Sequence, residues 1–138
     1  MKLVTDRTES DALLGNEKGV YSHVDLNRVE TAVAALAAEL SAIGYKINLT
    51  TKTDWMPPED FLAETWPVKS QMERYLKNIR TIRNIFPLEG KGTLPDSMDR
   101  LTWKTANLIE MILKNAGEKV DAVKQAWNYS GEVFAGEE

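Results

Sequence analysis

Acidic side chains in the third long helical segment are the first candidates for chemistry in this sequence. Glu110, Glu118 and Asp121 are spaced so that they lie near one another on a helix. Two neighbouring carboxylates can act as a general acid and a general base, as they do in hydrolysis. Ordinary surface charge explains the same residues and is far commoner. The sequence therefore predicts no enzyme and leaves a hydrolase as an alternative.

Other catalytic patterns in the chain are incomplete. His23 is the single histidine, so one chain cannot build a site that needs two imidazoles. The string Gly90-Lys91-Gly92-Thr93 lacks the upstream glycine and the strand-to-helix context of a phosphate-binding loop. The absence of cysteine removes disulfides, thiolate metal sites and a thiol nucleophile, and it fits a reducing cytosol. We therefore expect no cofactor and no metal.

Charge and hydropathy restrict the partners. The 138 residues carry 17 Lys and Arg against 21 Asp and Glu, and this net charge of -4 disfavours general binding to nucleic acid. Residues 69–83 are locally basic and form either a stripe that follows phosphates or, more commonly, a solvated face.

Acidic residues soon after the N-terminus leave no apolar run for a signal peptide. The most apolar stretch, residues 32–42, is far shorter than the roughly 20 residues of a membrane span, so we expect a soluble chain.

Three long helices are expected to position these residues. The first covers residues 24–43, follows the N-cap Ser22 with its capping partner Asp25 in the first turn, and ends at Gly44. Its large aliphatic residues alternate between spacings of three and four, which places them on one face as the predicted core. They are Leu26, Val29, Val33, Leu36, Leu40 and Ile43. The second helix is expected over residues 69–85, and the third from the N-cap Thr102 to Trp127, with a bend allowed at Gly117.

Short elements complete the prediction. Helices are expected over residues 9–14, after the cap Thr8, and over residues 58–64. Residues 45–53 alternate apolar and polar side chains like a strand, which must pair with residues 3–5, 19–21 or 132–135, or with another molecule. The predicted fold is mainly α, a three-helix bundle with short extra helices, one or two short β-strands and extended arms. We expect an N-terminal arm (1–20), a helical domain (21–127) and a C-terminal arm (128–138).

Large apolar side chains exceed what the predicted core can hold. A bundle of this size has room for about two of the four tryptophans, so the surplus predicts contact surfaces for a partner subunit or a sugar. Gly131 and Gly136 are expected to prevent a helix in the C-terminal arm, which is then either disordered or docked elsewhere. The candidate interface residues are Tyr45, Ile47, Leu49, Trp55, Trp66, Trp127, Tyr129, Val133 and Phe134.

Several strings, taken in order, resemble a known family. The strings are Lys18-Gly19, Tyr21, Asp25-Leu26-Asn27-Arg28-Val29, Lys52-Thr53-Asp54-Trp55, Ser70-Gln71-Met72, Tyr75-Leu76, Asn78, Leu94-Pro95, Ser97-Met98, Leu101-Thr102, Ala106-Asn107, Ile109-Glu110, Ala126-Trp127 and Tyr129-Ser130-Gly131-Glu132. This ordered set, which runs from about Val4 to Glu132, resembles a small domain of minor structural, tail-associated proteins of phages and prophages from Gram-positive bacteria. The sequence departs from that pattern in the longer stretch 56–66 and at Trp103, where the pattern has tyrosine.

The resemblance implies a non-enzymatic virion protein and brings no catalytic residues. It would be a tail-associated adaptor or spacer that assembles through its termini and exposed aromatics. Its partners would be other virion proteins and copies of itself, and its location would be the virion, after synthesis in the bacterial cytoplasm. The alternative is a tail module that recognises the host surface or a carbohydrate.

A set of polar residues is expected to fix how the helices meet. They are Asp25, Asn27, Arg28, Asp54 and Glu110. The other explanation is that these are ordinary exposed charges, whose pairs contribute about 0–1 kcal/mol each.

Overall fold

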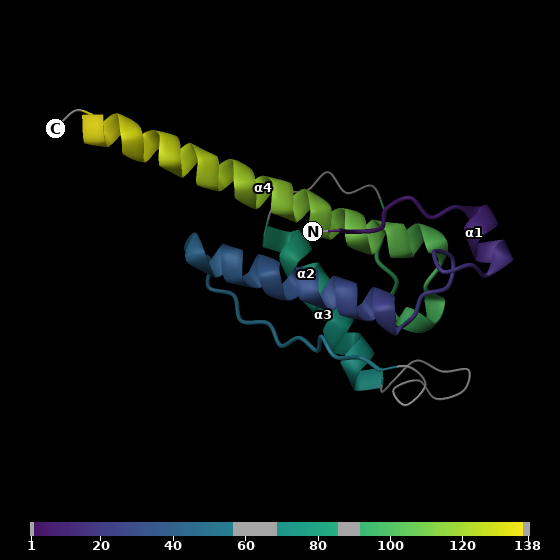
Figure 1. Cartoon of the computed structure of the whole chain (residues 1–138). Helices are drawn as coiled ribbons and strands as arrows, with labels where there is room; N and C mark the ends of the chain where they lie inside the picture. The colour runs from purple at the N-terminus through teal and green to yellow at the C-terminus, as the bar shows by residue number, and fades with distance from the viewer. Residues whose placement is uncertain (1, 57–68, 86–91, 137–138) are drawn as a thin grey trace.

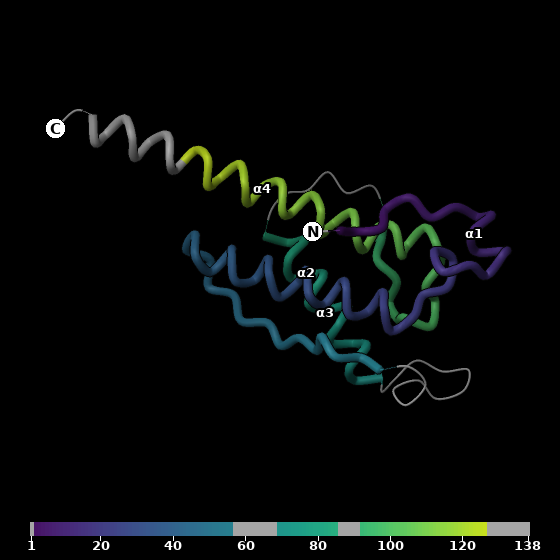
Figure 2. The backbone as a smooth tube through the Cα atoms, viewed as in Figure 1, coloured from purple at the N-terminus to yellow at the C-terminus, as the bar shows by residue number. Residues whose placement is uncertain are grey.

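The computed structural model describes the backbone of residues 2–56, 69–85 and 92–136, with side chains up to residue 126 (Figures 1 and 2). In these ranges the elements are α1 (Glu9–Leu14), α2 (His23–Ala42), α3 (Lys69–Ile85), the 3-10 helix η1 (Met98–Arg100) and α4 (Trp103–Gly136). The chain is mainly helical, as predicted, and α2, α3 and α4 pack against one another. Figure 1 shows α2 and α4 side by side, with α3 crossing them.

Local capping determines where the helices begin. Ser22 caps α2, and its capping box with Asp25 is formed as predicted. A second predicted cap, Thr8, begins α1, and Gly15 ends that helix in the left-handed conformation at φ 62°. At the start of α4, the amide of Thr105 donates to Thr102 Oγ1 at 3.3 Å, and the amide of Thr102 donates back to Thr105 Oγ1 at 2.8 Å. The predicted bounds of α1 and α3 are confirmed.

The predicted aliphatic seam forms the centre of the bundle. All six of its residues on and after α2, from Leu26 to Ile43, are buried. They pack with Tyr75, Ile79 and other apolar residues of α3, and with α4 residues that include Ile109 and Leu113. Burial of each such side chain stabilises the fold by about 1.5–3 kcal/mol, so the seam accounts for much of the driving force for folding.

No strand is present among the residues that the structure describes. Residues 45–56, which we call the connecting segment, run along the bundle without a strand partner. Side chains satisfy part of its backbone instead. The carbonyl of Thr50 accepts from Asn78 Nδ2 at 2.8 Å, and the amide of Lys52 donates to Glu30 Oε1 at 3.1 Å. The alternating pattern is therefore explained by one face of an extended chain that packs Ile47 and Leu49 on the core.

Helix α4 is longer than the sequence predicts. Its backbone continues to Gly136 without a break at Gly117, so the expectation that Gly131 and Gly136 prevent a helix is wrong. A glycine inside a helix costs only about 1 kcal/mol relative to alanine, and extending an existing helix needs no new nucleation. The backbone of residues 128–136 is thus part of α4 rather than a non-helical arm. At 1.5 Å per residue the 34 residues span about 50 Å.

Two further findings concern the predicted helix at 58–64 and membrane-spanning helices. The helix predicted over residues 58–64 lies outside the described residues. Among the described residues, no helix is both long and apolar enough to cross a membrane.

Candidate functional site

Four charged side chains form a buried cluster, which we call the Arg7 cluster. It contains Arg7 from residues 2–8, here called the N-terminal strap, with Asp25 and Arg28 from α2 and Glu110 from α4. The side chain of Glu110 is 0% exposed and that of Arg7 is 2% exposed. Two guanidinium groups face two carboxylates, so the formal charges of the cluster cancel.

Arginine geometry accounts for the closeness of these contacts. Arg28 binds Glu110 with one edge of its guanidinium, Nε to Oε1 at 2.6 Å and Nη2 to Oε2 at 2.9 Å. Arg7 Nη2 reaches Glu110 Oε2 at 2.7 Å and Asp25 Oδ1 at 3.1 Å. Such bidentate, charge-assisted pairs are shorter and stronger than neutral hydrogen bonds. Hydrogen bonding to Glu110 raises the pKa of Arg28 further, so its guanidinium remains charged.

The cluster also holds the backbone of the N-terminal strap. The amide of Val4 donates to Glu110 Oε1 at 2.9 Å. The amide of Arg7 donates to Asn107 Oδ1 at 3.0 Å, and Asn107 Nδ2 donates to the carbonyl of Arg7 at 2.9 Å. These side chains of α4 take the place of a neighbouring strand. The strap is thereby fixed along α4, beside which Figure 1 draws it.

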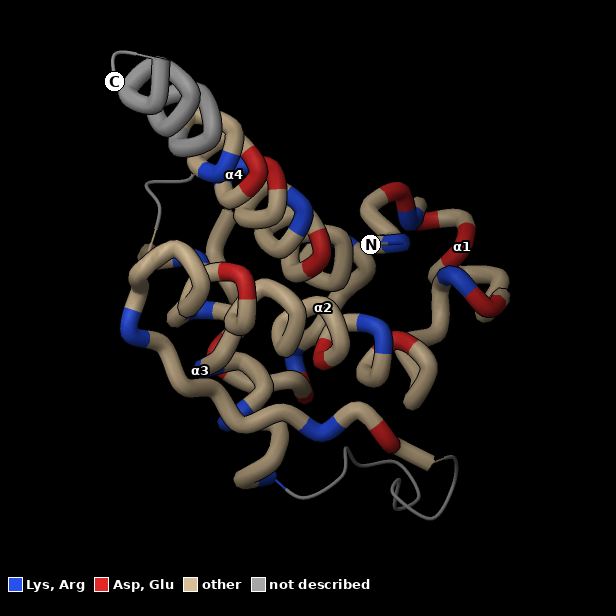
Figure 3. Tube along the Cα trace, turned by 60° about the vertical axis from the view of Figure 1, so that its left-hand side comes forward, with Lys and Arg blue, Asp and Glu red and all other residues tan. Residues whose placement is uncertain are grey.

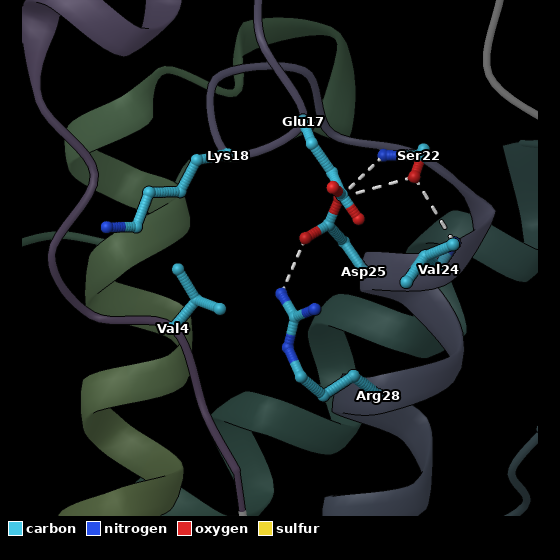
Figure 4. Close-up of a pocket in the computed structure, with 7 residues that line it drawn as sticks. All are labelled: Val4, Glu17, Lys18, Ser22, Val24, Asp25 and Arg28. Carbon is cyan, nitrogen blue, oxygen red and sulfur yellow. Dashed lines mark hydrogen bonds and ion pairs between the residues drawn. The ribbon is translucent and has the colours of Figure 1, made fainter.

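A small cavity opens beside this cluster (Figure 4). It has a volume of about 220 Å³, and its lining includes Lys18, Asp25 and Arg28. Figure 4 shows Asp25 and Arg28 directed toward each other, with Ser22 above them. The amide of Ser22 donates to Asp25 Oδ2 at 2.8 Å, and Arg28 Nη2 donates to Asp25 Oδ1 at 2.5 Å. Asp25 and Arg28 of this cavity are thus already bonded to each other, while Lys18 pairs with Asp6.

A second buried network joins α2, α3 and the connecting segment. Its centre is Glu30, which accepts hydrogen bonds from Arg74 Nη1 at 2.6 Å and from the indole Nε1 of Trp55. Asn27 lies beside it and clamps the backbone of Trp55, accepting from its amide at 2.7 Å and donating to its carbonyl at 2.9 Å. This network, the Glu30 network, attaches the connecting segment to the bundle.

Two tyrosines link the N-terminal region to α3. The hydroxyls of Tyr21 and Tyr75 are hydrogen-bonded, and the guanidinium of Arg7 lies 5.5 Å from the ring centre of Tyr21. Burial raises the pKa of Tyr75, and it also raises the pKa of Tyr21. Both side chains therefore stay neutral at physiological pH. No buried side-chain nitrogen or oxygen lacks a hydrogen-bond partner within the part of the chain that the structure describes.

The structure brings together three of the five predicted polar residues. Asp25, Arg28 and Glu110 meet in the Arg7 cluster, whereas Asn27 belongs to the Asn27–Trp55 clamp. Asp54 takes part in neither network, because its exposed carboxylate pairs with Lys52 Nζ at 3.1 Å. The prediction that Asp54 helps to fix how the helices meet is therefore wrong.

Sequence reasoning missed five other residues whose side chains fix the strap and the connecting segment. They are Arg7, Glu30, Arg74, Asn78 and Asn107. One signal was available, because Glu30 lies four residues after Leu26 and three before Val33 and so shares the buried face of α2. Arg7 carries no such periodic signal, since the strap is irregular.

The predicted interface residues fall into three groups. Trp55 is only 3% exposed and packs in the core, so its assignment to an exposed interface is wrong. Tyr45 is 40% exposed, while Ile47 and Leu49 are half-buried against the core. Trp66 and the side chains of Trp127, Tyr129, Val133 and Phe134 lie outside the described residues.

The three candidate acids do not share one site. Glu110 is buried in the Arg7 cluster, whereas Glu118 and Asp121 are exposed and line a separate cavity with Lys114. His23 is half-buried at the first position of α2. The described residues contain no group of three or more His, Asp or Glu side chains that could hold a metal ion. No protein-family model, curated protein or solved structure matches the chain significantly.

Proposed function

We propose that this chain is a non-enzymatic structural protein of a phage particle, a tail-associated adaptor or spacer that binds other virion proteins and copies of itself. The observation that carries the proposal is the charge-balanced Arg7 cluster. It uses buried ionic groups from the strap, α2 and α4 to bond these three elements to one another. Such a cluster favours one arrangement of the strap, α2 and α4 over others. A spacer in a virion needs a fixed shape of this kind.

The ordered strings that resemble tail-associated proteins supply the biological context for this rigidity. Three of those strings contain residues that build the two networks, among them Asp25, Trp55 and Glu110. The long continuous α4 adds a stiff element of about 50 Å, suited to a spacer between neighbouring subunits.

Deleting the coding sequence from the phage or prophage that carries it tests this proposal. We expect particles with a defective or missing tail feature, visible by negative-stain electron microscopy, and restoration by the wild-type chain supplied in trans. The control is complementation by the exposed-site variant Glu118→Gln, which should restore assembly fully. Normal particle shape and infectivity in the deletion strain would contradict a structural role.

Carbohydrate recognition is the second candidate, favoured by one cleft. A cavity of about 380 Å³ lies between the α1 region and the start of α4, and its lining includes Trp103, Tyr21 and Asp99. An aromatic face beside hydrogen-bonding groups is the chemistry that a sugar ring needs. Titrating the protein with soluble cell-wall polysaccharide tests it, and binding that the Trp103→Ala variant loses would support it. Equal binding by both proteins would exclude this cleft as the sugar site.

A further inference from the structure

The α1 region is held firmly although α1 itself buries none of its residues. Residues 8–19, which we call the knob, contain several fixing contacts. Asn16 Nδ2 donates to Asp11 Oδ1 at 2.9 Å, in addition to the Thr8 capping box. A Cβ atom placed on Gly19 would lie 1.9 Å from the carbonyl oxygen of Asp11, so the returning loop packs directly on the backbone of α1. The knob is a defined structure that contributes no side chain of α1 to the core.

Two adjacent leucines project from this knob. Leu13 is 81% exposed and Leu14 is 75% exposed. A single exposed leucine needs no explanation. Two adjacent exposed leucines on a capped helix that buries none of its own residues are unusual, and such a patch is typical of a contact surface. The exposed charges around the pair are mostly acidic, including Glu9 and Glu17. Figure 3 shows acidic positions along the segments that flank α1.

An apolar pocket that could accept leucine side chains lies between the N-terminal strap and α2. Its volume is about 340 Å³, and small or apolar side chains of Leu3, Ala32 and Ala35 form much of its wall. Among the residues that the structure describes, the charged ones in its lining are Lys2 and Arg28, and none is acidic. Arg28 is already paired with Asp25 and Glu110, so the positive edge of this apolar pocket is supplied by Lys2. The knob, in contrast, is apolar with a negative edge.

We propose that Leu13 and Leu14 of one copy insert into the Lys2–Arg28 pocket of a second copy of this chain. The opposite charges around the two surfaces make a second copy of the chain a complementary occupant. Because the knob and the pocket are different surfaces, the contact is head-to-tail, and repetition builds a ring or a filament rather than a closed pair. The inference deepens the proposed function, since it names the surfaces through which the spacer would assemble with itself.

Complementary variants of the full chain test this contact by sedimentation velocity over a concentration series. Leu13→Gln with Leu14→Gln removes the apolar knob without changing charge or a buried residue. Ala35→Glu blocks the pocket at an exposed position of α2. Met111→Gln, an exposed apolar residue on α4 that lines neither surface, is the control.

The wild type and the control should gain weight-average mass as concentration rises, and less so at high salt. Each of the two complementary variants alone should stay at the monomer mass. Their equimolar mixture should reach twice that mass and stop there, because it contains one working knob and one working pocket per pair.

Three results would overturn the proposal. They are a wild type that stays monomeric at all concentrations, association that survives loss of both leucines, and a mixture that does not restore the dimer. Any of them would leave the proposed virion role standing if deletion of the coding sequence still damages the particle, so failure of this contact is distinguishable from failure of the proposed function.

Discussion

Replacing Glu110 by Gln removes one negative charge from the middle of the Arg7 cluster while keeping the size of the side chain. The two carboxylate oxygens now accept four hydrogen bonds: Oε1 from the Val4 amide and Arg28 Nε, and Oε2 from Arg7 Nη2 and Arg28 Nη2. An amide nitrogen cannot accept, so Gln retains at most the two bonds to its single oxygen. Arg7 and Arg28 are then left with Asp25 as their only carboxylate in the cluster.

The expected loss follows from the burial of this site. Breaking a buried ion pair by removing one partner destabilises a protein by about 3–5 kcal/mol, because the remaining charge stays buried without compensation. Two lost charge-assisted hydrogen bonds, at about 1.5–3 kcal/mol each, give a similar figure. We therefore expect Glu110→Gln to lower the free energy of unfolding by about 3–5 kcal/mol.

Urea denaturation monitored by circular dichroism measures this loss. With an m-value of about 1.5 kcal/mol/M, the midpoint should fall by about 2–3 M. The matched control is Glu118→Gln on the exposed face of α4, which should change stability by no more than about 0.5 kcal/mol. A loss below about 1 kcal/mol for Glu110→Gln, with the helical spectrum intact, would refute the claim that this cluster holds the elements together.

Other changes probe the core, the tyrosines and the knob. Leu36→Ala in the fully buried seam should cost about 2–5 kcal/mol in the same urea assay, and a loss under about 0.5 kcal/mol would place the seam outside the core. Burial raises the pKa of Tyr75 in the folded state, so its contribution to stability is fully present below the unfolded value of about 10 and is lost as pH rises above it. Tyr75→Phe should therefore weaken the fall of the urea midpoint above about pH 10, whereas an unchanged pH profile would contradict this. Gly19→Ala should speed amide hydrogen exchange in α1 while leaving exchange in α2 and α4 unchanged, because the added Cβ would meet Asp11 but no core residue; uniform acceleration in all helices would show that the knob is part of the core.

Helix positions were the most predictable part of the structure. The seam from Leu26 to Ile43 and the caps Thr8 and Ser22 specify α1 and α2 through local geometry alone. Local signals failed where the outcome depended on length or on distant partners. Gly131 indicated a break, but a helix that already runs from Trp103 tolerates a glycine at modest cost.

The strand prediction failed for a related reason. Alternation in residues 45–53 correctly indicates an extended chain with one face inward, since Ile47 and Leu49 pack on the core. Periodicity does not say what satisfies the backbone of such a chain. Here Glu30, Arg74 and Asn78 do so, from positions more than 20 residues away in sequence.

The candidate site was predictable only in part because ion pairs join segments that are remote in sequence. Asp25 and Arg28 are three residues apart and belong together on one helix turn. Glu110 belongs to the polar set that the sequence predicts to fix how the helices meet. Arg7, which is 103 residues from Glu110, has no local feature that reveals its burial. The same limit applies to Trp55, whose indole is buried through its bond to Glu30.

Quantitative mass spectrometry of gradient-purified phage particles tests the proposed virion role most directly. Isotope-labelled peptides of this chain, measured beside peptides of a major capsid or tail protein from the same particles, give its copy number. The proposed function predicts a fixed whole number of copies per particle that is the same in every preparation. Absence of the chain, or a trace amount that falls with each purification step like a host contaminant, would contradict it.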